Sequence, residues 1–483
     1  MGNAERHGLT ADVTDPKPAS GLWAPVRASV LAKGERRMEA RSYLTDGYGQ
    51  RQLIEAAPSG WAKMQTMADV WQPSRLKGVV VRARVGLPFL SAGQVFESAP
   101  VVRKWLAHSH VPDVADRKVE SSWILMSCSG RVGRITAVYP HHEDIVLTHD
   151  LLRIVPHDRH HYGWLYAYMR TSQFSSIAKA SQYGHMIKHL EPEHVREMPV
   201  ILPSPETMSK TSALVSQVMA KRREAIAMLE SVHSEYELLV NPEQTPLAEN
   251  EISSVRASSL TSGRRRLDAE HFRSDYLQIE EIFRSAGSYT VEALADVTES
   301  VSLGNRFRRY FGENGTPYRS AEELFDLNAS VTKRVYAGLV ENRDKYTLRA
   351  GWIIMACSGQ TYGLNGRTLL LTKSHDGIFG SHDLIRIVPN IERINTGYLY
   401  LVLSNPKYGR PMAIRNAYGT SIPHLDPVDI RDMPVPRFDS ETEVRLGERV
   451  VRAIELKAEA DAFENQATEL AENVIADFLR LHE

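Results

Sequence analysis

The chain has 483 residues, of which 42% are hydrophobic and 24% charged, a composition typical of a soluble globular protein of two or three domains. It has no apolar stretch near the ~20 residues needed to cross a bilayer and no secretory signal at its start, so we expect a cytoplasmic protein without a membrane partner. The formal net charge of −1 argues against a protein that coats nucleic acid non-specifically, but it is compatible with locally positive surfaces.

In chain order, the sequence predicts two similar halves of α+β class. The expected segments are an N-terminal extension (1–24), a first domain (25–204), a long helix (205–240), a linker (241–258), a second domain (259–438) and a second long helix (439–483). Short apolar runs such as WILMSCSG from Trp123 and GWIIMACSG from Gly351 predict strands. Segments that begin at Gly163 and Gly397 predict helices, the second interrupted at Pro406. Each domain ends in a proline-rich segment, EMPVILPSP or DMPVPRF, which is too rich in proline for a central strand.

The two domains are copies of one another. Trp123 and Cys128 match Trp352 and Cys357, in each case at an offset of 229 residues. THDLLRIVP, which begins at Thr148, matches SHDLIRIVP 233 residues later. Because the offset drifts by only a few residues along the chain, the sequence predicts one duplicated fold with small loop insertions, and not an array of short repeats.

Each domain is followed by a helix with a heptad pattern of apolar residues. In the first helix the predicted seam consists of Val215, Val218, Arg222, Ala225, Leu229, Val232, Tyr236 and Leu239. The pattern is less regular in the second helix because it continues only after a phase shift. These are either long domain helices or an antiparallel coiled-coil spacer that holds the two domains apart. The seam residues that are candidates for docking a partner are Val215, Val218, Arg222 and Leu229 in the first helix and Val451, Ile454, Leu470 and Val474 in the second.

Several motifs in the second half carry a family resemblance. RLDAEHF (266–272) opens this half, GYLYLVLS (397–404) follows, and GTSIPHL (419–425) precedes DMPVP (432–436). Their order, duplicated and joined to two long helices, resembles the target-recognition domains of Type I restriction-modification specificity (S) subunits over nearly the whole chain. The first half has RMEARSY and GHMIKHL in place of the first and third motifs, which suggests a diverged member from a methylation-associated phage-defence system.

This resemblance implies two target-recognition domains in tandem, with the long helices packed as an antiparallel coiled-coil spacer. It implies a chain that is not itself an enzyme and that recognises double-stranded DNA, directing a partner adenine-N6 methyltransferase to a bipartite target. The expected partners are double-stranded DNA, two DNA adenine methyltransferase subunits, and a restriction, translocase or other defence subunit. S-adenosylmethionine is expected on the partner methyltransferase, and no cofactor is expected on this chain.

Polar turns inside the matching blocks are the candidate DNA contacts, because such side chains reach base edges and phosphates. Arg131 follows Gly130 where Gln360 follows Gly359, and arginine suits guanine whereas glutamine suits adenine. The alternatives are tight turns with solvated side chains and, for the basic clusters, a solvated charged face. The candidates are Ser129, Arg131, Arg134, Tyr183, His185 and Lys188 in the first half, and Arg306, Arg308, Arg309, Arg319, Ser358, Gln360, Tyr362, Asn365, Arg367, Tyr418, Thr420 and Ser421 in the second. A matching basic cluster in the first half consists of Arg75, Lys77, Arg82 and Arg84.

Enzymatic interpretations have less support in the sequence. The only two cysteines, Cys128 and Cys357, lie in apolar runs, which indicates buried, inert thiols and not nucleophiles activated by a histidine such as His149. The chain has no Cys-x-x-Cys pair, His-Glu-x-x-His motif or phosphate-binding glycine loop, so we expect no catalytic residue and no metal site. Two other functions stay open: a duplicated protein-interaction scaffold that does not bind DNA, and a stand-alone enzyme with an unrecognised site.

Overall fold

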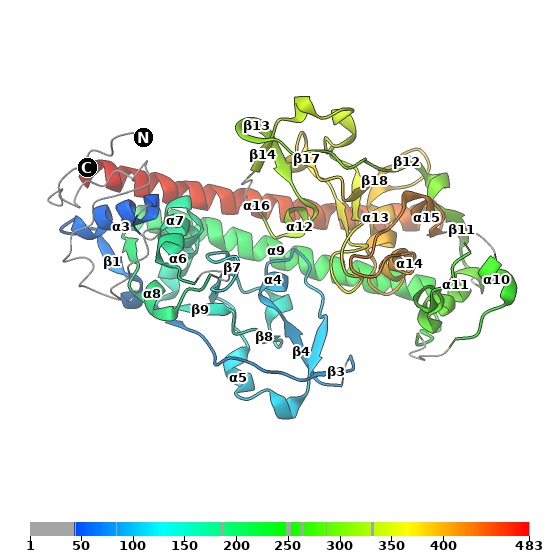
Figure 1. Ribbon diagram of the computed structural model, residues 1–483, viewed down its shortest axis with the longest axis horizontal. Helices are drawn as coiled ribbons and strands as arrows, with labels where there is room; N and C mark the ends of the chain where they lie inside the picture. The colour runs from blue at the N-terminus through cyan, green and yellow to red at the C-terminus, as the bar shows by residue number, and fades with distance from the viewer. Residues whose placement is uncertain are drawn as a thin grey trace, which may run out of the picture. The chain divides into compact units, whose positions relative to one another are not determined.

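The computed structural model describes residues 43, 45–83, 85–184, 188–247, 253–261, 265–285, 287–329 and 333–482. The predicted N-terminal extension and the candidate residue His185 lie outside the described residues. The chain forms two compact units: unit 1 comprises Met1–Ala220 and Ala460–Glu483, and unit 2 comprises Lys221–Glu459. The division falls within two long helices, α9 (Pro205–Val240) and α16 (Ser440–His482), so each helix contributes residues to both units (Figure 1).

Unit 1 is built on a four-stranded antiparallel sheet. Its strands, in spatial order, are β2 (Ala68–Trp71), β9 (Leu151–Pro156), β6 (Ile124–Ser127) and β7 (Ile135–Ala137). The remaining strands are β3 (Val80–Val81), β5 (Lys104–Leu106), β4 (Leu87–Leu90) and β8 (Val146–Leu147), which form a second sheet in that order, and β1 (Trp61–Lys63) and β10 (Pro199–Ile201), which form a pair. All four residues of β6 are buried, which explains why Ile124, Leu125 and Met126 are consecutive apolar residues and do not alternate with polar ones.

Unit 2 has the same arrangement of its main sheet. The strands, in spatial order, are β12 (Thr298–Leu303), β18 (Leu384–Pro389), β15 (Ile353–Ala356) and β16 (Thr368–Leu370). The remaining strands are β14 (Lys333–Val335), β13 (Phe311–Arg319) and β17 (Phe379–Gly380), which form a second sheet in that order, and β11 (Thr290–Ala293) and β19 (Pro434–Arg437), which form a pair. The two proline-rich segments are β10 and β19, which pair with one strand each, so neither is a central strand.

Both units also contain α-helices besides α9 and α16. Those in unit 1 are α3 (Asp46–Ala56), α4 (Ala92–Val95), α5 (Val114–Arg117), α6 (Arg159–Arg170), α7 (Ser172–Ser181) and α8 (Pro192–Arg196). Those in unit 2 are α10 (Ala257–Thr261), α11 (Ser274–Ser285), α12 (Ala321–Phe325), α13 (Thr396–Ser404), α14 (Gly409–Ile414) and α15 (Pro427–Arg431). Helix α13 ends two residues before Pro406, where the sequence predicts an interruption.

Helix α6 lies at the centre of the core of unit 1, and helix α13 lies at the centre of the core of unit 2. An Asp158 side chain caps the start of α6 by accepting from the His160 amide, and Asn395 caps α13 in the same way. The Trp164 indole, which is fully buried, donates to the Ile201 carbonyl of β10 at 2.9 Å. A buried tyrosine on α13, Tyr398, likewise donates its hydroxyl to β19. Each helix is therefore anchored to the proline-rich strand of its own unit.

The buried face of α9 follows the predicted heptad seam at most positions. Val215, Val218, Arg222, Val232 and Tyr236 are all at most 2% exposed. Their burial within this chain contradicts the expectation that Val215, Val218 and Arg222 form a surface for docking a partner. Leu229 is half-buried and packs against the core of unit 2.

The seam predicted for α16 is wrong in register. Leu470 and Val474 are only half-buried, whereas their neighbours Ala471 and Ile475 are fully buried. The buried positions continue without a phase shift and include Glu464, which is 1% exposed. Among the predicted docking residues of this helix, Ile454 is 6% exposed and Val451 packs against the core, so these two are also core residues.

Within unit 2, residues 221–240 of α9 run antiparallel to residues 440–459 of α16. Lys221 pairs with Glu459 at one end, and Glu235 pairs with Arg445 and Arg449 at the other. Between them, Ala225 packs against Ala453 and Leu456.

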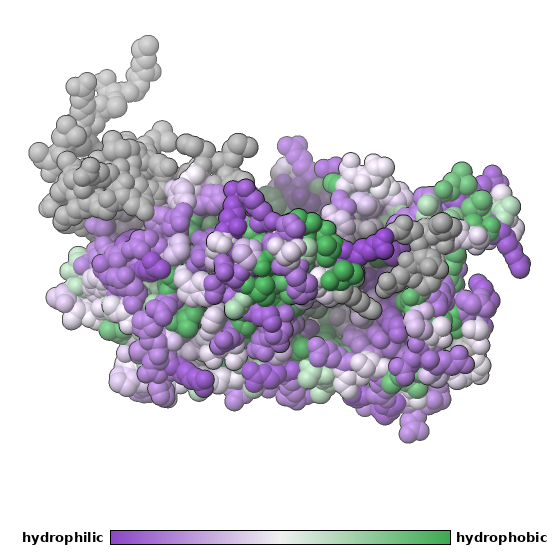
Figure 2. All heavy atoms as spheres, turned by 90° about the horizontal axis from the view of Figure 1, so that it is seen from below, coloured by the Kyte–Doolittle hydropathy of each residue, from purple (hydrophilic) through white to green (hydrophobic). Residues whose placement is uncertain are grey.

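No helix within the described ranges combines the length and the apolar character needed to cross a membrane. The face displayed in Figure 2 is mostly hydrophilic, with hydrophobic residues interspersed among polar ones.

Candidate nucleic-acid interface

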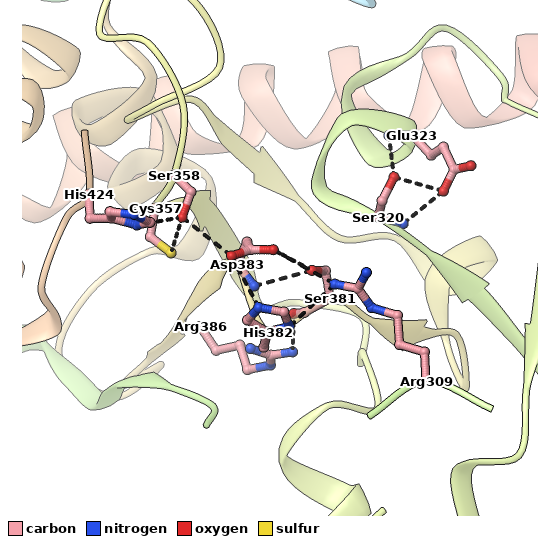
Figure 3. A network of polar contacts seen from close by, with 10 residues as sticks. All are labelled: Arg309, Ser320, Glu323, Cys357, Ser358, Ser381, His382, Asp383, Arg386 and His424. Carbon is pink, nitrogen blue, oxygen red and sulfur yellow. Dashed lines mark hydrogen bonds and ion pairs between the residues drawn. The ribbon is translucent and has the colours of Figure 1, made fainter. Parts of the chain in front are cut away.

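In unit 2, three segments that are distant in sequence meet around Asp383, immediately before β18 (Figure 3). The Ser358 hydroxyl, in the loop after β15, lies 3.3 Å from Asp383 Oδ1 and 2.8 Å from Nδ1 of His424. On the other side, Arg309 lies 4.0 Å from Asp383 Oδ2 and 3.4 Å from His382 Nδ1. The network thus joins the basic segment 306–309, the loop after β15 and the segment 418–424.

A buried arginine shapes the turn that carries Asp383. Arg386 is 3% exposed and donates to the carbonyls of Leu384 at 2.7 Å and Ser381 at 3.1 Å. Arg153 in unit 1 donates in the same way to the carbonyls of Leu151 and Thr148. Burial lowers the pKa of both guanidinium groups to about 10, so both stay charged at neutral pH.

The histidines beside these aspartates act as hydrogen-bonding groups in the fold. Burial lowers the pKa of both His149 and His382, so both rings are neutral at pH 7. Nδ1 of His149 accepts from the Leu76 amide at 3.4 Å, and Nδ1 of His382 faces the Arg309 guanidinium.

The loop after β6 in unit 1 and the loop after β15 in unit 2 are held by the same set of backbone contacts, which we call the frame. Ser129 and Tyr183 both form isolated antiparallel bridges with His189, and Ser358 and Tyr418 do so with His424. In each loop the glycine after the serine donates its amide to the facing segment, from Gly130 to Lys188 and from Gly359 to Pro423, at 3.1 Å in both units. The loops after β6 and β15 are therefore each held by the equivalent segment of their own unit, residues 188–189 in unit 1 and 423–424 in unit 2.

Most of the candidate DNA contacts lie on the surface of this frame. The exposed ones are Arg131, Arg306, Arg308, Arg309, Gln360, Tyr362, Tyr418, Thr420 and Ser421. The half-buried ones are Ser129, Arg134, Tyr183, Lys188, Arg319 and Ser358. Some of these side chains already have partners: Tyr183 donates to Glu191, Lys188 to the Gly184 carbonyl, and Arg319 to the Ala329 carbonyl.

Two of the predicted contacts are contradicted by burial. Asn365 is 0% exposed and donates its amide to the carbonyls of Gly359 at 3.1 Å and Pro423 at 2.9 Å, so it holds the loop and cannot reach a duplex. Arg367 is 8% exposed, and its guanidinium lies 5.1 Å from the centre of the Phe325 ring. Arg134, its counterpart in unit 1, stacks on Phe96 at 4.1 Å in the same way.

The basic segment before β13 is joined to exposed aromatic residues. The Arg308 guanidinium lies 5.1 Å from the Tyr310 ring, and Tyr310 and Phe311 are 41% and 53% exposed. Tyr336, which the sequence reasoning missed, is 42% exposed and donates its amide to the Tyr310 carbonyl at 2.9 Å. In unit 1, Arg75, Lys77 and Arg82 are exposed, and Arg84 lies outside the described residues.

Two arginines that support the frame were also missed as functional residues. Arg266, in the RLDAEHF motif, donates to the carbonyls of Asn416 and Ala417, both at 2.7 Å, and so fixes the chain just before Tyr418. Arg410 donates to the carbonyls of Thr361 and Gly363 at 2.8 Å. The motif was the available signal for Arg266, whereas nothing in the sequence marks Arg410.

Neither cysteine is placed as a nucleophile. Both are 3% exposed, and burial raises the pKa of Cys128 to about 12 and that of Cys357 to about 11. The Cys128 thiol faces the backbone carbonyl of His149 and the Gln72 amide, not the imidazole ring. Within the described residues, no group of three or more histidine, cysteine or acidic side chains is arranged to hold a metal ion.

Comparisons with known proteins give matches among solved structures only. No protein-family model and no curated protein matches the chain. One similar structure is the S subunit of a Type I restriction-modification system from M. genitalium, with 11% identity, a TM-score of 0.35, and coverage of 86% of this chain and 95% of that chain. A second, described as the structural basis of complex assembly and conformational transition of the type I R-M system, has 12% identity, a TM-score of 0.27, and coverage of 87% and 98%. The HsdS subunit from Thermoanaerobacter tengcongensis has 13% identity, a TM-score of 0.25, and coverage of 88% and 97%. These three structures thus come from Type I restriction-modification systems, and two of them are described as S or HsdS subunits; all are matched over most of the chain at low identity and low TM-score.

Proposed function

We propose that this chain is a non-catalytic subunit that recognises double-stranded DNA at a bipartite sequence and directs a partner adenine-N6 methyltransferase to it. Each unit is proposed to read one half of the target as a target-recognition domain. The helices α9 and α16 are proposed to act as the spacer that sets the distance between the two halves. S-adenosylmethionine would bind to the partner enzyme.

The observation that carries this proposal is the duplicated frame with different side chains at its surface. In both units the loop after the central strand is held by backbone hydrogen bonds to the facing segment. The side chains at the tip differ, with Arg131 in one unit and Gln360 in the other. A rigid frame with variable polar side chains is what sequence reading requires, because base edges differ in their pattern of donors and acceptors.

The basic segment beside this frame supplies a means of binding the phosphate backbone. Arg306, Arg308 and Arg309 are exposed, and Arg309 contacts the same network as the loop after β15. Phosphate contacts position a protein on the duplex, while the neighbouring loop reads the bases. A chain whose net charge is −1 can bind DNA in this way only if its positive charge is concentrated locally.

The test is a genome-wide map of N6-methyladenine in cells with this gene, without it, and with the gene restored. Loss of one bipartite motif on deletion, and its return on restoration, would support the proposal. An unchanged map in cells that contain an adenine methyltransferase would overturn it and favour the protein-interaction scaffold.

A matched pair of variants tests the role of the basic segment in the same assay. Replacement of Arg306 and Arg308 by alanine should weaken methylation at all copies of the motif without changing its sequence. Arg284→Ala removes an exposed arginine from α11, whose ion pair among the described residues is with Glu281, and should have no effect. Equal losses in both variants would contradict a specific role for the segment.

A further inference from the structure

The loop that carries Gln360 is rigid before any ligand binds. Its backbone is held by Arg410, which donates to the carbonyls of Thr361, Gly363 and Asn365 at distances from 2.8 to 3.1 Å. The buried Asn365 amide ties the same loop to the facing segment. A side chain on such a loop loses little further conformational freedom on binding, which favours specific recognition.

The Gln360 side chain is itself oriented by the facing segment. It is exposed, and its Nε2 donates to the Ser421 carbonyl at 2.9 Å. Because an amide nitrogen carries two hydrogens, one N–H of Gln360 stays available to a ligand. Within the part of the chain that the structure describes, Oε1 of Gln360 accepts no hydrogen bond. The held amide therefore offers one donor and one acceptor side by side.

Adenine is the base whose major-groove edge matches this pair. Adenine presents N7 as an acceptor and the N6 amino group as a donor, so glutamine can form two hydrogen bonds with it. Guanine presents two acceptors, N7 and O6, so Oε1 of the glutamine would face another acceptor. Arg131, which follows Gly130 in unit 1 as Gln360 follows Gly359 in unit 2, has only donors and suits guanine.

We propose that Gln360 selects an adenine in the half-site read by unit 2 and that Arg131 selects a guanine in the half-site read by unit 1. This inference rests on the proposed function and adds to it the base that each loop selects. The two residues are specificity determinants, and the Ser421 carbonyl is the group that orients Gln360.

The experiment restores the gene, as wild type or as a variant, to cells that lack it, and maps N6-methyladenine. Gln360→Arg should change one position of one half-site from adenine to guanine, with a preference of roughly 5- to 150-fold, and should leave the other half-site unchanged. Gln360→Ala should make that position degenerate. Arg131→Gln should change one guanine to adenine in the other half-site.

The outcomes separate this inference from the proposed function. If deletion leaves the map unchanged, the proposed function fails and the inference fails with it. If Gln360→Ala restores the wild-type motif and methylation still requires the adenine at that position, the proposed function stands and only the inference fails. If Gln360→Arg restores no methylation, Gln360→Ala decides: a degenerate position supports the inference, and a position that still requires adenine overturns it. Among the described residues, truncation of this exposed side chain removes one side-chain hydrogen bond, to the Ser421 carbonyl.

Discussion

The loops after β6 and β15 occupy the same place in the two units, but different side chains hold them. In unit 1 the Ser127 hydroxyl donates to the Arg131 carbonyl and accepts from the Arg134 amide at 2.9 Å. In unit 2 alanine occupies the place of Ser127, and Asn365 takes over by bonding to two carbonyls. The loop is four residues longer in unit 2, between Gly359 and Gly366, than in unit 1, between Gly130 and Gly133. The longer loop is thus braced by a residue of its own, Asn365.

This difference explains how a duplicated domain can diverge in what it recognises. The backbone bonds to the facing segment are the same in both units, so the loop keeps its position. The side chain that braces the loop is replaceable, provided that another polar group satisfies the buried carbonyls. The residues at the tip are then able to change without loss of the frame.

The largest expected effect tests whether the two units share their helix packing. A Cβ on Gly397 would lie 2.1 Å from the Gly447 carbonyl oxygen on α16, and one on Gly163 would lie 2.5 Å from Ser212 Cα on α9. Gly397→Ala and Gly163→Ala should each reduce the free energy of unfolding by about 3 kcal/mol, because backbone must move. Urea unfolding should be followed by amide exchange in each unit, because six of the seven tryptophans lie in the first half of the chain and their fluorescence does not report one site.

Gly93→Ala is the matched control for both variants. Gly93 lies in α4, and a Cβ there would meet nothing within 4 Å. This substitution should be neutral or stabilise by about 0.5–1 kcal/mol. A severe effect at Gly397 with none at Gly163 would show that the two units do not pack their helices in an equivalent way.

The second prediction concerns the different loop supports. Asn365→Ala should cost about 2–3 kcal/mol, because it removes two hydrogen bonds donated by a fully buried amide, to the carbonyls of Gly359 and Pro423. The Pro423 carbonyl still accepts from the Gly359 amide, whereas the Gly359 carbonyl loses this donor. Ser127→Ala should cost only about 1 kcal/mol, since it removes a single hydroxyl. Amide exchange at Gly359 should accelerate in the first variant. A cost below that of Ser127→Ala would refute the idea that Asn365 has replaced the serine as the support.

The third prediction is an acid sensitivity shared by both units. His142 and His375 each accept a backbone amide bond at the end of a 3-10 turn, and burial lowers the pKa of each to about 4. The unfolded chain takes up a proton near pH 6.5 while the folded chain does not, so stability present at pH 7 is lost as pH falls. Between pH 7 and pH 5 each histidine should cost about 2 kcal/mol.

Single variants locate this sensitivity in one unit at a time. His142→Gln should reduce the acid sensitivity of unit 1 alone, and His375→Gln that of unit 2 alone. The measurement is the free energy of unfolding of each unit at pH 5 and pH 7, from amide exchange as a function of urea. Unchanged acid sensitivity in both variants would mean that other groups, such as paired carboxylates, control it.

Much of the fold could be predicted from the sequence, because its signals are local. The buried strand β15 is a continuous apolar run, and β6 is one up to Ser127. The heptad seam of α9 coincides with the buried face at Val215, Val218, Ala225 and Val232. The seam of α16 could not be predicted in register. Its buried face includes Glu464, which pairs with Tyr166 and Arg170, and a carboxylate usually marks a solvent-exposed face.

The candidate site was less predictable, because burial in a loop depends on distant residues. Gln360 and Asn365 are both amide side chains in one polar turn, and sequence does not distinguish them. Asn365 points inward because the Pro423 carbonyl, 58 residues away, accepts its amide. The stacking of Arg134 on Phe96 and of Arg367 on Phe325 likewise depends on elements placed by the fold. The exposed candidates remain predictions until DNA binding is measured.

The smallest expected effect on stability is that of variants in the basic segment of unit 2, which should change DNA binding and leave folding intact. Arg306→Ala and Arg308→Ala should leave the free energy of unfolding unchanged within about 0.5 kcal/mol, because both side chains are exposed. If each contacts one phosphate, the slope of log affinity against log salt should fall by about 0.9 per variant, measured by fluorescence anisotropy of a labelled duplex. Arg75→Ala should have the same effect through unit 1.

Arg309→Ala should differ, because this residue also faces His382 and Asp383, and its loss should disturb the loop after β15 as well as the salt slope. Equal slopes for all four variants and the wild type would remove the basic segments from the DNA interface and leave the loops as the only contact in each unit.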